Sequence, residues 1–164
     1  MKTSSKIILL AGGLLALASS AFAQAANLDR SDRNFFEKAA KSGMKEVEVS
    51  QAVLGKAVNP SVREFAQMMV ADHSKANEEL KALAAKKGVT LPAPETKHAE
   101  KWIKNDKDVD DEYIKEMISD HKDAVDLFKE AAKSKDADIA AFASKTLPHL
   151  EHHLQTVKSL KKMN

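Results

Sequence analysis

The sequence contains no cysteine, which excludes disulfide bonds, a lipid-modified cysteine and a thiol nucleophile. Only five glycines and four prolines occur among its 164 residues, and no glycine-rich phosphate loop or nucleophile elbow is present. No run of residues has the character of a β-strand, whereas Ala, Lys, Glu and Leu dominate, as they do in helices. These absences predict an all-α protein that is not an enzyme.

The N-terminal segment has the features of an export signal. Lys2 and Lys6 precede an apolar run over residues 7–18, and small residues stand just before Gln24. Twelve apolar residues are too few to span a bilayer, which needs about 20. We therefore predict that residues 1–23 are a cleaved signal peptide, rather than a retained anchor, and that the mature protein is periplasmic with no transmembrane segment.

Charge of one sign is also lacking once the signal is removed. The full chain has 26 basic and 24 acidic residues, and cleavage takes away Lys2 and Lys6, which leaves equal numbers of each. Acidic and basic residues are interspersed along the rest of the chain. Because nucleic-acid binding needs a concentrated basic surface, we expect no nucleic-acid partner.

Apolar residues recur at three- and four-residue steps through most of residues 24–164, which we expect to form a single domain. Asn59 and Pro60 fit the start of one helix, and Gly88 fits its end. The region from Gly88 to about Asp108 has no long periodic segment, although a short helix around Trp102 fits there. The predicted helices are about 31–58, 60–87, 110–134 and 137–162.

Two internal similarities indicate how these helices pair. The pattern of the second helix returns 48 residues later in the third, and 77 residues later in the fourth. Two helical hairpins joined by a long connection make a ferritin-like four-helix bundle with a crossover between helices two and three. Within this bundle Gly43 indicates either close approach of a neighbouring helix or a kink, and Pro148 predicts a bend or local unwinding.

Three of the six histidines lie on apolar stripes of different helices: His73, His121 and His153. With a rise of about 1.5 Å per residue, His73 and His121 lie about 20 and 17 Å from the starts of their helices. His153 lies about 15 Å from the matching end of the fourth helix, which runs the opposite way. Glu48, at the edge of the first helix's stripe, reaches a similar level. Three imidazoles and one carboxylate can therefore meet in the middle of the bundle.

Neutral imidazole and carboxylate groups suit zinc, copper or iron. His149 forms an i, i+4 pair with His153, a recurrent ligand spacing, and Asp72 and Asp120 could orient the rings from behind. Methionine ligands for copper are a further option, although methionine more commonly fills gaps in a core. The alternative is that the histidines are neutral core residues, satisfied by groups across the bundle.

A ferritin-type di-iron centre needs Glu-x-x-His on two helices. The only such motif here runs from Glu95 to His98, in the crossover, so ferroxidase chemistry is disfavoured.

Several segments together resemble domain-of-unknown-function family 4142, whose members are exported bacterial proteins often labelled outer-membrane proteins. These segments are Phe36 with Ala39-Ala40, Glu46-Val47-Glu48, Val62 to Ala66, Met69 to His73, Tyr113 to His121, and Leu147-Pro148 to His153-Leu154. The resemblance covers nearly all of residues 24–164 and implies a ferritin-like four-helix fold without naming a reaction. Its label implies, beyond a periplasmic location, association with the outer membrane.

Two functions of different kinds follow from these features. The leading hypothesis is a periplasmic, non-catalytic bundle that binds a transition metal through its core histidines. The alternative is an interaction module that docks an envelope partner protein, a membrane surface or a second copy of itself. Contiguous exposed apolar side chains would favour docking, whereas a closed cluster of histidines would favour metal binding.

Overall fold

The computed structural model describes residues 28–95, 97–104 and 108–163, so the predicted signal peptide lies outside the described residues. The described part is all-helical, as predicted, and contains five helices and no strand. None of these helices is both long enough and apolar enough to cross a membrane. The helices are α2 (Arg30–Leu54), α3 (Pro60–Lys87), α4 (His98–Lys104), α5 (Val109–Ala131) and α6 (Ala137–Met163).

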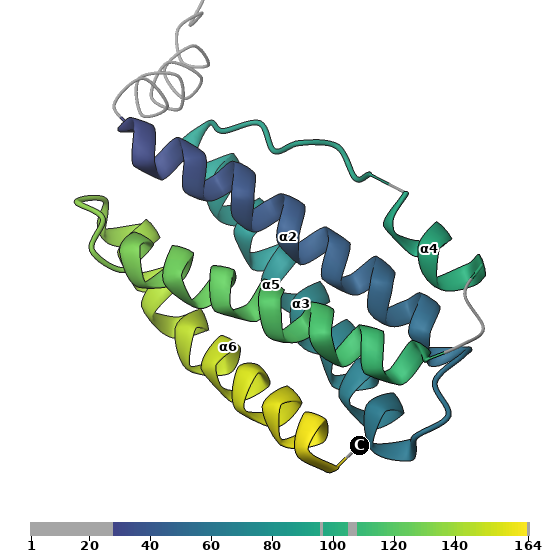
Figure 1. The fold of residues 1–164 in the computed structure, drawn as a ribbon. Coiled ribbons are helices and arrows are strands. Elements are labelled where there is room, and N and C mark those ends of the chain that lie inside the picture. The colour runs from purple at the N-terminus through teal and green to yellow at the C-terminus, as the bar shows by residue number, and fades with distance from the viewer. Residues whose placement is uncertain (1–27, 96, 105–107, 164) are drawn as a thin grey trace, which may run out of the picture.

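The four long helices pack side by side as two hairpins (Figure 1). Helix α2 lies against α3 and α5, and α6 lies against α5 and α3. The connection from α3 to α5 runs the length of the bundle, so α3 and α5 point the same way and α2 and α6 point the other way (Figure 1). Along this connection the short helix α4 packs on α2.

The ends of the helices follow from local hydrogen bonds. Asn59 caps α3 by accepting from the backbone N–H of Ser61 at 2.9 Å, and Pro60 occupies the first turn. Gly88 ends the same helix in the left-handed conformation, with φ of 68°, which glycine adopts without steric cost. Asp110, in the first turn of α5, accepts from the backbone N–H of Asn59 at 2.8 Å and so ties the two hairpins together.

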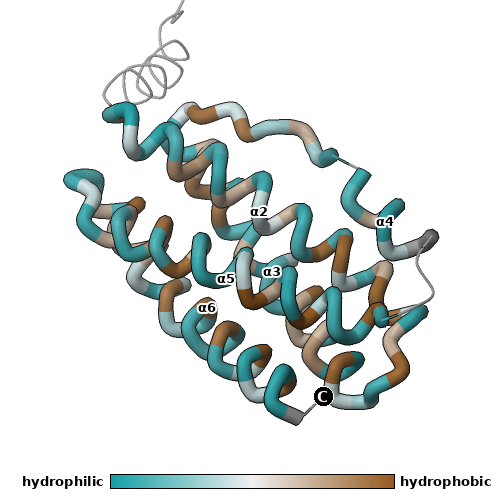
Figure 2. Tube along the Cα trace, in the orientation of Figure 1, coloured by the Kyte–Doolittle hydropathy of each residue, from teal (hydrophilic) through white to brown (hydrophobic). Residues whose placement is uncertain are grey.

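Apolar positions recur along each long helix with hydrophilic positions between them (Figure 2). The buried apolar side chains form two separate cores. One, the Phe36 core, includes Phe128 and Phe142, whereas the other, the Tyr113 core, includes Trp102. Between them lies the polar layer, which we define as the four buried side chains Glu46, His73, His121 and His153.

Two positions expected to disturb helices do not interrupt them. Helix α2 is continuous through Gly43, where a Cβ atom would overlap Oδ1 of Asn77 on α3. Gly43 therefore leaves room for the side chain of Asn77, which lies against α2 at this position. Helix α6 is likewise continuous through Pro148, which lies at an exposed position.

A buried cation joins the end of α3 to the start of α6. Lys87 is only 2% exposed, and its Nζ lies 2.6 Å from Asp136 and 2.7 Å from Asp138. Asp136 also caps α6, because its Oδ1 accepts from the backbone N–H groups of Asp138 and Ile139. One carboxylate thus stabilises both the helix end and the contact between two helices.

We predict that Asp136→Ala lowers the free energy of unfolding by about 2 kcal/mol, because the cap and one partner of Lys87 are both lost. Asp136→Asn keeps a capping oxygen and should cost about half as much. Urea denaturation of the two variants and the wild type measures both effects. Unchanged stability in Asp136→Ala would contradict this account.

Candidate metal centre

Each long helix contributes one side chain to the polar layer. Glu46 comes from α2, His73 from α3, His121 from α5 and His153 from α6. Glu46 and His121 are fully buried, and His153 and His73 are 2% and 7% exposed. The flanking turns of these helices carry the apolar residues of the two cores, so the layer is enclosed between two apolar regions of the bundle.

The three imidazoles meet at one point. One ring nitrogen of each histidine lies within 4.8 Å of a ring nitrogen of the other two. Ligand nitrogens around a tetrahedral zinc ion lie about 3.3 Å apart, given metal–nitrogen bonds of about 2.0–2.1 Å, so modest ring movements would close a shell. Glu46 stands beside this triangle, with Oε2 3.8 Å from Nε2 of His73 and 3.7 Å from Nδ1 of His121.

Hydrogen bonds to groups outside the cluster fix the orientation of two of the rings. Nδ1 of His121 lies 2.9 Å from the backbone carbonyl oxygen of Met117, which can only accept, so Nδ1 carries the proton. Nε2 of His153 lies 2.9 Å from Oδ2 of Asp72, so Nε2 carries the proton in the neutral ring. The lone pairs are then on Nε2 of His121 and Nδ1 of His153. Such outer partners are typical of metal-binding histidines.

The polar layer contains every buried side-chain nitrogen or oxygen that lacks a hydrogen-bond partner in the described part of the chain. The five atoms are both carboxyl oxygens of Glu46, Nε2 of His73, Nε2 of His121 and Nδ1 of His153. Buried polar atoms are normally paired, because each unpaired one costs about 1–3 kcal/mol. Two of the unpaired nitrogens are the ones on which the outer hydrogen bonds leave a lone pair. The residues therefore fit a bound cation.

Burial controls the protonation of the layer. It lowers the pKa of His73 well below 6.5, and His121 and His153 add to this effect. It lowers the pKa of His121 to about 4, whereas for His153 the hydrogen bond to Asp72 opposes the lowering by burial. Burial also raises the pKa of Glu46 well above 4.5. At neutral pH the layer thus offers three neutral imidazoles, the form that binds metals.

Glu48, the predicted carboxylate ligand, lies elsewhere, and the ligand set is corrected accordingly. Its Oε1 accepts a 3.0 Å hydrogen bond from the backbone N–H of Ala99, at the start of α4. Positions 46 and 48 are about 200° apart around a helix, so they cannot face the same layer. The structure brings Glu46 to the histidines instead.

The two predicted outer aspartates have different partners. Asp72 holds the ring of His153 across the bundle, on α6. Asp120 forms an ion pair with Lys45, at 2.7 Å, on the outer side of α2 and α5, and its negative charge helps to raise the pKa of Glu46. Of the two aspartates, Asp72 alone is hydrogen-bonded to a ring of the polar layer.

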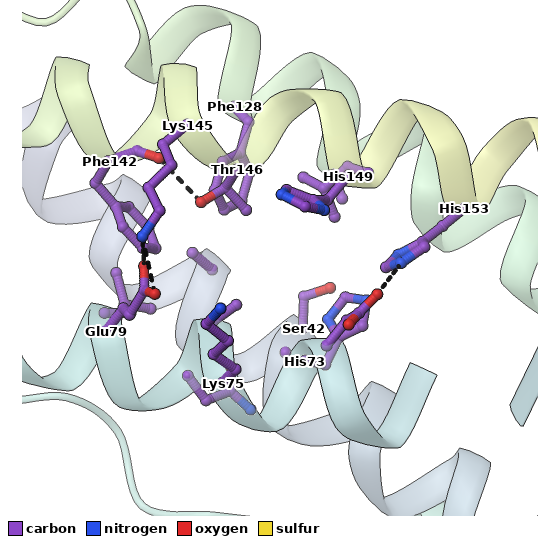
Figure 3. A pocket seen from close by; sticks show the side chains of 18 of the residues that line it. Ser42, His73, Lys75, Glu79, Phe128, Phe142, Lys145, Thr146, His149 and His153 are labelled. Atoms are coloured by element: carbon purple, nitrogen blue, oxygen red, sulfur yellow. Dashed lines mark hydrogen bonds and ion pairs between the residues drawn. The ribbon is translucent and has the colours of Figure 1, made fainter. Parts of the chain in front are cut away.

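His149 is exposed and lies outside the histidine triangle. It lines a cavity whose wall also includes His153, one turn away on the same helix, and His73 on the facing helix (Figure 3). The i, i+4 spacing correctly places His149 and His153 on one side of α6. The candidate ligands beside His153, however, are His73 on α3 and His121 on α5.

The sequence did not lead us to predict Glu46 as a member of the site, because a charged side chain is normally expected to face solvent. The signal was present in the spacing. Buried positions of α2 continue from Gly43 through Glu46 to Ser50 and Val53, at steps of three and four.

Comparisons with known proteins identify a matching domain family and a solved structure with a similar helical fold. A sequence profile of a domain of unknown function, DUF4142, matches residues 17–160. Among curated proteins, none matches this chain. A solved structure, the crystal structure of a DUF305 fragment from Deinococcus radiodurans, superposes with a TM-score of 0.72 at 11% sequence identity, covering 83% of this chain and 98% of that one. At this identity the likeness shows a shared helical fold.

We predict that Glu46→Met stabilises the metal-free protein by about 1–3 kcal/mol, because it replaces a buried, unpaired carboxyl with an apolar side chain of similar length. Glu48→Met, two residues along the same helix, is the matched control and should give no gain, since Glu48 accepts a hydrogen bond from α4. Denaturation in chelator measures both. A destabilised Glu46→Met would mean that the carboxyl has a stabilising partner.

Proposed function

The chain belongs to the DUF4142 family, and we propose that it binds one transition-metal ion through His73, His121 and His153. The observation that supports this function is that the buried atoms without a hydrogen-bond partner belong to the same side chains as the candidate metal ligands and the adjacent Glu46. All five buried side-chain atoms without a partner in the described residues belong to one cluster, and that cluster joins the four long helices. A cation at its centre would bind the three nitrogens, and its charge would be balanced by the adjacent Glu46 carboxylate.

The donor set defines the class of ion. Three imidazoles with a nearby carboxylate suit zinc, copper or iron rather than magnesium or calcium, which prefer oxygen ligands. The Glu46 carboxyl, 3.8 Å from His73 and 3.7 Å from His121, is placed to supply negative charge once it loses its proton. Asp72 and the carbonyl of Met117 would orient the rings of His153 and His121 as outer-shell groups.

The layout supports a ferritin-like four-helix bundle whose centre differs from the ferritin-type di-iron site. Three of the four long helices contribute a histidine, each without the Glu-x-x-His pair, and one carboxylate reaches the cluster where a di-iron site uses four. We propose a single ion in a non-catalytic binding site.

The alternative function, docking of an envelope partner, has less support from the surface. Among residues 28–95, 97–102 and 108–162, whose side chains the structure describes, Val58 is the only large apolar one that is exposed, at 81%. A docking surface normally presents a contiguous apolar patch of several such residues.

Export to the periplasm is a second part of the proposal, supported by the sequence of residues 1–23. Sequencing the N-terminus of the protein isolated from a periplasmic extract tests it, and Gln24 is the expected first residue. An intact Met1 in that fraction would indicate a retained anchor, and recovery from the cytoplasm alone would contradict export.

For the metal, we predict that zinc or copper raises the melting temperature relative to chelator, because the ion binds the folded state only. At a free concentration of 100 times Kd the gain is about 2.7 kcal/mol, or roughly 10 °C. His153→Ala should abolish this difference, whereas His152→Ala should retain it, since His152 is the exposed neighbour on the same helix. Core histidines without a metal role would give equal losses in metal and chelator.

The pH dependence follows from the lowered pKa of the buried rings. An exposed histidine accepts a proton near pH 6.5, so a site built from exposed histidines would lose its metal near that pH. In the folded protein burial lowers the pKa of all three rings, that of His121 to about 4, so the metal-dependent gain should extend below pH 6.5 and be lost by about pH 4. The contribution of the three rings to stability should nevertheless fall below pH 6.5, because the imidazoles of the unfolded chain take up protons that the buried rings do not. Equal melting temperatures with zinc, copper and chelator at pH 7 would reject the site.

A further inference from the structure

A cavity of about 110 Å³ adjoins the polar layer between α3 and α6 (Figure 3). At one end its wall includes the rings of His73 and His153. At the other end an ion pair crosses from Lys145 to Glu79, at 2.8 Å (Figure 3). The cavity therefore extends from the protein surface to the edge of the histidine cluster.

The cavity and Glu46 lie on different edges of the histidine triangle. Glu46 approaches His73 and His121, whereas the lining of the cavity includes His73 and His153 but neither Glu46 nor His121. Three histidine ligands leave a fourth position on a tetrahedral ion, which is the arrangement of open rather than closed metal sites. Along the His73–His153 edge, the cavity provides free space for a ligand at this fourth coordination position.

The walls select for a small, weakly polar molecule. They are mainly apolar, with Leu80, Phe128 and Phe142 among them. Of the charged side chains in the wall, Lys145 is paired with Glu79, Asp72 is hydrogen-bonded to His153, and Lys75 is exposed. Entry of a charged molecule into this mainly apolar space would carry a desolvation cost. In size, an engineered apolar cavity of about 150 Å³ binds benzene, so about 110 Å³ suits a ring of five atoms or a chain of similar bulk.

We propose that this cavity is a ligand site of the metal centre, which admits a small uncharged molecule with one nitrogen donor on an apolar body. Its donor atom would reach the ion along the His73–His153 edge, and its body would fill the space between α3 and α6. This inference rests on the proposed function, because it needs an ion at the three histidines.

The test uses the protein loaded with Co²⁺, whose visible absorption reports changes in coordination, and imidazole as the probe. Ala76 lines the cavity one turn from His73, so Ala76→Leu should fill it. Ala71, exposed on the same helix and outside the lining, provides the matched control Ala71→Leu. We expect imidazole to change the spectrum saturably in the wild type and Ala71→Leu, with at least tenfold weaker binding in Ala76→Leu and unchanged Co²⁺ affinity in all three.

A second probe keeps the test independent of how the variant folds. Imidazole carrying a phenyl group at its fourth position exceeds the cavity and should leave the wild-type spectrum unchanged. Equal binding of both probes, equal imidazole binding in Ala76→Leu and the wild type, an unresponsive wild-type spectrum, or loss of cobalt on adding imidazole would each overturn the ligand site. Failure of Co²⁺, zinc and copper to bind at all would instead overturn the proposed function, and the ligand site with it.

Discussion

A buried polar atom without a partner costs about 1–3 kcal/mol, and the polar layer concentrates five such atoms in one place. Apolar side chains at the same four positions would have joined the Phe36 core to the Tyr113 core. The layer instead divides the interior in two, and the surrounding structure holds two of its rings through the backbone of Met117 and the carboxylate of Asp72. Buried polar atoms are normally paired, and exceptions to this rule are expected at functional sites.

Much of this frame could be read from periodicity and end signals. Asn59 and Gly88 bound α3 at the residues where capping chemistry predicts its ends. The stripe positions of His73, His121 and His153 follow from the helical repeat, and the rise per residue gives their common level once the helix directions are known. These features depend on local geometry, which a single sequence contains.

What the sequence could not supply depends on neighbours across the bundle. Asp72 and Asp120 each precede a buried histidine, yet Asp72 reaches His153 and Asp120 reaches Lys45, because different helices face them. Glu46 is similar: its spacing places it in the stripe, but charge argues for solvent unless three imidazoles opposite are known. Rotation of each helix about its axis settles these contacts, and packing of the whole core determines that rotation.

The polar layer draws its members evenly from the two hairpins, with Glu46 and His73 in the first and His121 and His153 in the second. An ion held by both would be a cross-link, in a chain with no cysteine to form a covalent one. Such a link closes a loop through most of the domain, and its removal would release a correspondingly large chain entropy on unfolding. Neither hairpin alone carries the full donor set, so loading with metal would follow the docking of the two halves and mark the completion of folding.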